Sequence, residues 1–252
     1  MILGFLGTGH ITTSVIEGIF KSKLKFKKIY ISPRNNIVAK KLSKRFKKVY
    51  ISKNNQQLID SSDWVFLAIT PQVAKKILRL LKFKKRKKII SFISTLKIKD
   101  LELITKNKNI TRVIPLPFIG MKKGPVIISP KDKSAKSFFK HLGKVIEIKS
   151  EKLSKGFWTT SSFMASFYNL IFVTSSWLIS KGIKQKEADQ YVKELFLALS
   201  EDAVQKKNIN LKQLVSESQT PGGTNASVLK NLKKNKFYKI QTKVFNEIFK
   251  KF

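Results

Sequence analysis

Cysteine is absent from this sequence, and it has only two histidines and only 15 acidic residues against 52 lysines and arginines. Without cysteine the chain can form no disulfide, no thiolate metal site and no thiol nucleophile. The two histidines, His10 and His141, lie far apart in the sequence, so we expect no histidine-based metal site and predict that no metal is bound. No charged and then apolar leader precedes the first predicted strand, so we expect a cytoplasmic location.

The shortage of acidic residues gives the chain a net charge of +37. Such a charge is typical of proteins that bind nucleic acids, because neutralising phosphates releases counterions, and a nucleic-acid-binding protein is therefore the non-enzyme alternative. The lysines, however, are spread over nearly every predicted helix and loop, and they far outnumber the arginines that read bases through paired hydrogen bonds. We predict a lysine-rich solvated surface without a specific nucleic-acid partner.

A glycine-rich turn follows the first apolar segment. Residues 2–6 predict a buried strand, Gly7 and Gly9 a tight turn, and the apolar spacing over residues 11–20 a helix. This order predicts the start of a dinucleotide-binding unit, in which a pyrophosphate approaches the N–H groups at the helix N-terminus. Thr12 stands at the third position of the motif and is expected to loosen the packing of helix on strand. An ordinary turn without a ligand is the alternative.

The end of the second predicted strand, residues 28–32, carries no acidic residue. An aspartate or glutamate about 20 residues beyond the motif would bind the ribose 2′-OH of NAD. Ser32 and Arg34 stand there instead, and a hydroxyl and a guanidinium suit a 2′-phosphate. We therefore predict NADP as the cofactor, with NADPH preferred over NADH. A plain turn with a surface arginine is the alternative.

Apolar runs and helical patterns alternate as far as residue 148, which predicts an α/β fold with a doubly wound, mostly parallel sheet. Because ligands bind at the carboxyl ends of such strands, we expect the turns that follow them to surround one crevice. Further strands are predicted at 49–51, 64–69, 88–93, 110–114, 126–128 and 145–148, helices at 36–46, 73–81 and 134–141, and crevice turns at Gly7, Ser32, Thr70, Ser94 and Pro115.

From residue 150 onward no strand pattern remains, and the chain reads as helices only. Residues 157–179 contain no charged residue and are long enough to span a bilayer. Their many serine and threonine side chains favour a helix buried in protein, at a subunit interface for example, and we predict no membrane association. A Pro-Gly-Gly-Thr turn at 221–224 precedes a further helix and predicts a carboxylate-binding site at its N-terminus. A connecting loop is the alternative.

Four segments resemble the pyrroline-5-carboxylate reductase family: Gly4–Gly9, Ala68–Gln72, Arg112–Pro115 and Thr220–Thr224. The resemblance covers nearly the whole chain. It implies an N-terminal Rossmann domain over residues 1–150 and an all-helical dimerisation and substrate domain over residues 151–252. It also implies a homodimer or higher homo-oligomer, and NAD(P)H-dependent reduction of a cyclic imine, 1-pyrroline-5-carboxylate, to L-proline in proline biosynthesis.

The resemblance and the motifs together give a set of candidate site residues. The cofactor-binding residues are Gly7, Thr8, Gly9, His10, Ile11, Ser32, Arg34, Thr70, Pro71, Ser94 and Thr95, with the nicotinamide near the last four of these. The substrate-binding residues are Gly222, Gly223, Thr224 and Asn225, of which Thr224 and Asn225 are the candidate catalytic residues. The chain departs from the family pattern at Thr70, Leu116, Phe163 and Asn225. Another NADP-dependent oxidoreductase of this architecture, acting on a different imine or carbonyl, is therefore the enzymatic alternative.

Overall fold

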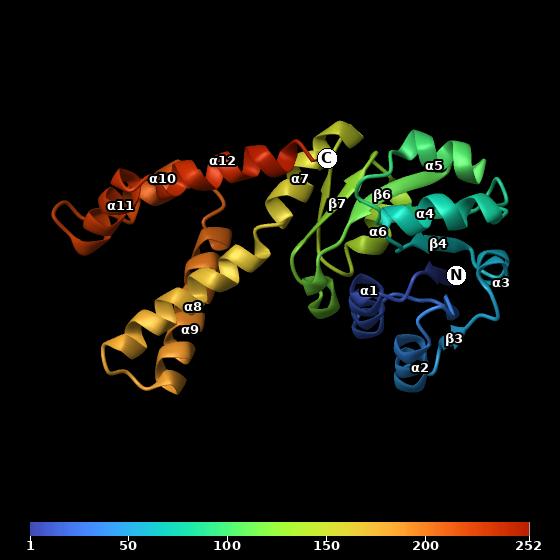
Figure 1. Cartoon of the computed structure of the whole chain (residues 1–252), viewed down its shortest axis with the longest axis horizontal. Helices are drawn as coiled ribbons and strands as arrows, with labels where there is room; N and C mark the ends of the chain where they lie inside the picture. Colours follow the sequence, from blue (N-terminus) through green and yellow to red (C-terminus); the bar gives the residue numbers. More distant parts are fainter. Residues whose placement is uncertain (252) are drawn as a thin grey trace. The chain divides into compact units, whose positions relative to one another are not determined.

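The computed structural model describes residues 1–251, which form two compact units, Met1–Trp158 and Thr159–Lys251 (Figure 1). The division falls within helix α7 (Glu151–Ser161), slightly beyond the boundary predicted at residues 150 and 151. Each unit has its own set of packed elements, and the two are described separately.

The first unit is built on a sheet with the order β3-β2-β1-β4-β5-β6-β7-β8. Neighbouring strands are parallel except β6 and β7, which are antiparallel. The strand order reverses at β1, which pairs with β2 on one side and β4 on the other, so the predicted doubly wound α/β fold is confirmed. The strands are β1 (Ile2–Leu6), β2 (Lys28–Ile31), β3 (Val49–Ile51), β4 (Trp64–Leu67), β5 (Lys88–Ser91), β6 (Ile110–Ile114), β7 (Pro125–Ser129) and β8 (Lys144–Glu147).

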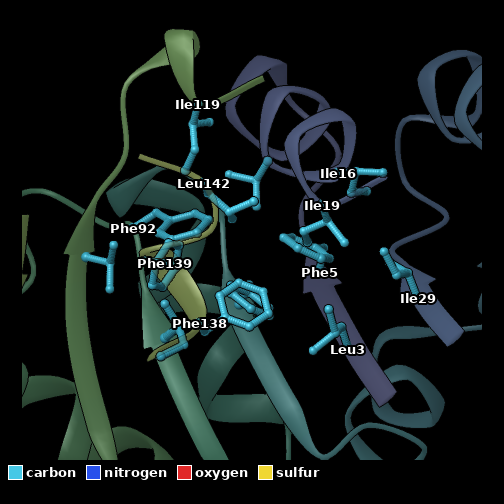
Figure 2. Packing of buried hydrophobic residues seen from close by; sticks show 14 of the residues in the cluster. Leu3, Phe5, Ile16, Ile19, Ile29, Phe92, Ile119, Phe138, Phe139 and Leu142 are labelled. Atoms are coloured by element: carbon cyan, nitrogen blue, oxygen red, sulfur yellow. The ribbon is translucent and has the colours of Figure 1, made fainter. Parts of the chain in front are cut away.

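The strands carry apolar side chains on both faces, and each face has its own hydrophobic core. Leu3 and Phe5 of β1 pack into one core, where Phe5 stacks on Phe66 of β4 with ring centroids 4.3 Å apart. Figure 2 shows Ile16 and Ile19 of helix α1 pointing into this core. Along each strand, the side chains between those of the first core point to the opposite face, and there Val65 and Leu67 of β4 pack into the second core.

Helices cover both faces of the sheet, as burial of both faces requires. Helices α1 and α6 contribute to the core that contains Phe5, whereas α3, α4 and α5 contribute to the opposite core. The helices α3 and α5 are additional to those predicted. The bounds are α1 (His10–Lys21), α2 (Asn36–Arg45), α3 (Asn55–Asp60), α4 (Pro71–Ile77), α5 (Ile98–Thr105) and α6 (Lys133–Phe139), with short 3₁₀ helices η1 (Leu78–Leu80) and η2 (Pro117–Met121).

Helix α1 is fastened to the strand before it by Thr12. This side chain is fully buried, and its hydroxyl donates a hydrogen bond to the Gly7 carbonyl at 2.8 Å. The expectation that Thr12 loosens this junction was wrong, because a small hydroxyl fits the space and also pairs a carbonyl of the turn. Further along α1, Gly18 allows η2 to approach, since a β-carbon there would lie 2.4 Å from the Ile119 carbonyl oxygen.

The second unit consists of helices throughout its described residues. Helices α8 and α9 pack side by side, with Ser175 donating a hydrogen bond to Asp189 at 2.6 Å and Phe167 meeting Phe196 edge to face. The single helix predicted over residues 157–179 is interrupted, because α7 ends at Ser161 and the next helix begins at Met164. The bounds are α8 (Met164–Ser180), α9 (Gln185–Gln205), α10 (Leu211–Glu217), α11 (Thr224–Lys234) and α12 (Phe237–Phe249).

Many apolar side chains of this unit are exposed. Phe172 and Trp177 of α8 are 66% and 59% exposed, and Tyr191 of α9 is 61% exposed. Within residues 1–251, the helical stretch Glu151–Ser180 is long and apolar enough, by length and composition alone, to cross a membrane, and little of its most apolar part is buried. A surface of this kind is typical of an interface with another macromolecule or a membrane.

Candidate functional site

A cleft of about 740 Å³ opens in the first unit, at the turns that follow strands β1, β2 and β4. This is the point where the strand order of the sheet reverses, and doubly wound sheets bind ligands there. Six predicted cofactor residues lie together in it: Gly7, Thr8, Gly9, Ser32, Arg34 and Thr70. The other lining residues are Leu6, Asn35, Asn36, Ile37, Asn55, Ala68, Ile69, Val73 and Ile77.

The turn after β1 forms the floor of the cleft. Gly7 has a φ of +113°, and a β-carbon there would lie 2.2 Å from the Ala68 carbonyl oxygen, so no other residue fits without displacing the end of β4. A β-carbon at Gly9 would meet nothing within 4 Å. Gly9 is also the N-cap of α1, and no side chain caps this helix among the described residues. The N–H groups of the first turn are thus left for an anionic ligand.

Ser32 links three turns of the cleft. Its side chain is buried, its Oγ accepts a hydrogen bond from the Gly7 N–H at 3.0 Å, and its hydroxyl donates to Oδ1 of Asn55 at 3.0 Å. Asn55, the first residue of α3, was not predicted as a site residue. The signal available in the sequence was its place just after β3, at the same edge of the sheet as the other turns.

Arg34 is exposed on the rim of the cleft, beside the start of α2. Asn35 caps that helix by accepting a hydrogen bond from the Val38 N–H at 3.3 Å. No acidic side chain of the described residues lines the cleft, whereas Ile37, Val73 and Ile77 give it an apolar part. This combination suits a ligand with an apolar planar ring and anionic groups, such as a nucleotide.

The remaining predicted cofactor residues lie outside the lining of this cleft. His10 and Ile11 are the first residues of α1, and Pro71 is the first residue of α4. Ser94 and Thr95 follow β5, the next strand along the same edge, with Thr95 exposed. Pro115 follows β6 and is buried. The structure therefore groups the turns of β1, β2 and β4 and places those of β5 and β6 further along the edge.

The loop that contains Ser94 and Thr95 is held by an ion pair whose cation is buried. Arg112 of β6 donates hydrogen bonds to the carbonyls of Ser94, at 3.3 Å, and of Leu96. Its guanidinium also pairs with Glu151, the first residue of α7, at 2.6 Å. Burial lowers the pKa of Arg112 from its ordinary value, and Glu151 opposes that shift. Arg112 belongs to a motif shared with the family, and the sequence alone indicates no role for it.

The Pro-Gly-Gly-Thr turn in the second unit leads directly into helix α11. Gly222 has a φ of +75°, and the Gly223 N–H donates to the Thr220 carbonyl at 2.9 Å, which closes the turn. Gly223 is the N-cap, and no side chain of the described residues caps the helix, so its first N–H groups can bind an anion. The side-chain amide of Asn225 donates to the Ser218 carbonyl at 3.1 Å, which leaves its Oδ1 as a potential acceptor.

Within residues 1–251, no group of three or more histidine, aspartate and glutamate side chains is placed to hold a metal ion. The polar groups of the two sites are backbone N–H groups, hydroxyls, amides and the Arg34 guanidinium.

Comparison with known proteins matches two separate parts of the chain to family models. Residues 2–95 match the family described as NADP oxidoreductase, coenzyme F420-dependent, and residues 151–252 match pyrroline-5-carboxylate reductase dimerisation. A pyrroline-5-carboxylate reductase from Staphylococcus haemolyticus is 24% identical over 92% of this chain and 89% of the relative.

Two solved structures share the fold over the entire length of this chain. A 1-pyrroline-5-carboxylate reductase from Streptococcus pyogenes has a TM-score of 0.85 at 20% identity, covering 100% of this chain and 97% of the other. A Plasmodium falciparum pyrroline carboxylate reductase with NADP bound has a TM-score of 0.83 at 22% identity, covering 100% of this chain and 96% of the other.

Proposed function

Because the chain belongs to the pyrroline-5-carboxylate reductase family of NADP-dependent oxidoreductases, we propose that it reduces 1-pyrroline-5-carboxylate to L-proline with NADPH. The observation that carries the proposal is that the chain has two features suited to binding a dinucleotide and a carboxylate. One is a glycine-floored cleft at the strand-order reversal, and the other is an uncapped helix N-terminus behind a Pro-Gly-Gly-Thr turn.

The residues of the cleft fit NADPH. Gly9 leaves open space beside the uncapped N-terminus of α1, which suits the pyrophosphate. Arg34 stands on the rim where NAD-specific proteins carry an acidic residue, and a guanidinium can bind a 2′-phosphate through two parallel hydrogen bonds. We therefore propose that NADPH is preferred over NADH.

The turn before α11 supports binding of an amino-acid-like carboxylate. The N–H groups of Thr224 and Asn225 lie in the first turn of the helix, at the positive end of its dipole. Oδ1 of Asn225 would accept a hydrogen bond from a protonated imine nitrogen, because its amide nitrogen is already bound to the Ser218 carbonyl. NADPH, when bound, supplies the hydride, and these residues bind and orient the acceptor.

The exposed apolar faces of α8 and α9 support self-association through the second unit. Phe172, Trp177 and Tyr191 are each more than half exposed, and large exposed apolar side chains that gather on neighbouring helices are typical of an interface. We propose a homodimer or higher homo-oligomer, in keeping with the match of residues 151–252 to a dimerisation domain. Light scattering at high salt is the measurement, since the +37 charge would otherwise mask association. A monomeric mass would contradict the proposal.

The test of the reaction is NADPH oxidation by the purified protein, with 1-pyrroline-5-carboxylate compared against other cyclic imines and against keto acids. The proposal predicts turnover with the pyrroline and proline as the product. Reduction of another imine or carbonyl, without turnover of the pyrroline, would favour the second candidate function. That alternative draws support from the departures at Thr70, Leu116, Phe163 and Asn225.

A further inference from the structure

Arg112 is a buried cation in the middle of a strand whose every residue is buried. Its side chain is 4% exposed, and its neighbours in β6 are apolar or are small hydroxyl residues. Burying a guanidinium is costly, and well-packed apolar residues often replace buried ion pairs without loss of stability. Stability alone is thus a weak reason for an arginine here. Its hydrogen bonds indicate a different reason.

The Arg112–Glu151 pair holds one loop at three points. Arg112 binds the carbonyls of Ser94 and Leu96, on either side of the exposed Thr95. Glu151 accepts hydrogen bonds from the Ile98 N–H, at 3.1 and 3.2 Å to its two oxygens, and thereby caps helix α5. Both ends of the segment from Ser94 to Ile98 are therefore fixed to a single ion pair.

We propose that Arg112 and Glu151 are positioning residues, which hold the loop from Ser94 to Leu96 in place to receive the nicotinamide end of the cofactor. The proposal rests on the proposed NADPH-dependent function. The loop follows β5, whereas the Gly7 turn and Arg34 follow β1 and β2. Because the nicotinamide is expected beside Ser94 and Thr95, the ion pair acts on that half of the dinucleotide, whereas the Gly7 turn and Arg34 bind the pyrophosphate and the adenosine half.

The central variant is Arg112→Met, which keeps an unbranched apolar stem and removes every donor. Lys88→Met is the matched control, because Lys88 forms a comparably buried ion pair with Asp132, the two side chains being 11% and 13% exposed. Lys88 begins β5 and therefore lies at the other end of that strand from the loop. Arg112→Lys is the conservative variant, since an ammonium can still donate to one or two carbonyls.

Both methionine variants should unfold at lower urea concentration than the wild type. Only Arg112→Met should lose hydride transfer from NADPH, by about 100-fold, because a displacement of about 1 Å at a reacting group has an effect of that size. Its affinity for adenosine 2′,5′-bisphosphate, which lacks the nicotinamide half, should stay within about twofold of the wild type, an RT ln 2 of less than half a kcal/mol. Arg112→Lys should recover part of the rate.

If Arg112→Met does not fold, Glu151→Gln takes its place, because it keeps an acceptor for the Ile98 N–H and removes only the charge. If Arg112→Met binds NADPH and adenosine 2′,5′-bisphosphate more weakly by the same factor, the positioning role is overturned and the cofactor assignment stays intact. An unchanged rate in Arg112→Met or Glu151→Gln, or an equal fall in Lys88→Met, would also overturn it. A wild-type protein that binds neither nucleotide would overturn the cofactor assignment and this inference together. If the wild type binds NADPH but does not reduce the pyrroline, the affinities of Arg112→Met for NADPH and for adenosine 2′,5′-bisphosphate still test the proposal. Weaker binding of NADPH alone would support the positioning role.

Discussion

Replacing Gly7 by alanine perturbs the cleft at its floor. A β-carbon at this position would lie 2.2 Å from the carbonyl oxygen of Ala68 and 2.9 Å from Cγ2 of Ile69. Ordinary van der Waals contact begins near 3.4 Å, so the turn and the end of β4 have to separate by about 1 Å. The φ of +113° adds strain of about 1–2 kcal/mol for any residue with a β-carbon.

The displacement and the strain together predict that Gly7→Ala lowers the free energy of unfolding by about 2–4 kcal/mol. The same shift moves the N–H that Ser32 binds, and NADPH affinity should fall with it. Gly9→Ala is the control: its φ is −78° and its β-carbon meets nothing within 4 Å. It should keep wild-type stability and lose only NADPH affinity.

Urea denaturation followed by circular dichroism measures the stability of both variants, and NADPH fluorescence titration measures their binding. Wild-type stability and wild-type NADPH affinity in Gly7→Ala would refute the reasoning. So would a Gly9→Ala protein as unstable as Gly7→Ala.

Substitutions at Arg34, Asp132 and Asn225 test the rim of the cleft, the acid stability and the substrate turn. Arg34→Ala should raise the Michaelis constant for NADPH by about tenfold or more, which corresponds to a loss of about 1.5 kcal/mol or more of binding free energy, and should leave the constant for NADH nearly unaffected. Arg86 is an exposed arginine outside the cleft, and Arg86→Ala should change neither constant. Equal losses for both cofactors would contradict the 2′-phosphate assignment. Burial opposes ionisation of Asp132, but hydrogen bonds from Lys88, Ser134, Thr111 and the Ala135 N–H hold its pKa well below the usual range. The stabilisation from this carboxylate is therefore present above the unfolded pKa of about 4 and is lost progressively as the pH falls from there through the lower pKa of the folded state. Asp132→Asn should lower the free energy of unfolding by about 3 kcal/mol at neutral pH and flatten that acid dependence. An unchanged urea midpoint would argue against this expectation. Asn225→Thr should keep or improve reduction of 1-pyrroline-5-carboxylate and Asn225→Leu should lose it, as measured by NADPH oxidation; full activity in the leucine variant would remove Asn225 from the site.

The sequence predicted most strands of the sheet because they are continuous apolar runs. Strand β4, Trp64–Leu67, is one such run, and both faces of it are covered. Helix α3 was missed because Asn55–Asp60 is less than two turns long and contains two apolar residues, too few for a period. The antiparallel direction of β7 depends on the path of the chain through η2, which hydrophobic spacing does not report.

The glycine turn and the absence of an acidic residue after β2 predicted part of the cleft directly. Each signal lies within a few residues of the end of its own strand, so a short stretch of sequence is enough to detect it. The contact of Ser32 with Asn55 requires β2 and β3 to be neighbours, and the pairing of Arg112 with Glu151 joins residues 39 apart. Partners of this kind are determined by the tertiary fold, and no short motif identifies them.

The central claim is hydride transfer from NADPH to a cyclic imine, and deuterium transfer tests it most directly. The purified protein is incubated with 1-pyrroline-5-carboxylate and NADPH that carries deuterium at the transferable position of C4. Mass spectrometry then measures the proline formed. We expect proline that contains a single deuterium, at a yield matching the NADPH consumed. Proline without deuterium, or NADPH consumption without proline, would contradict it.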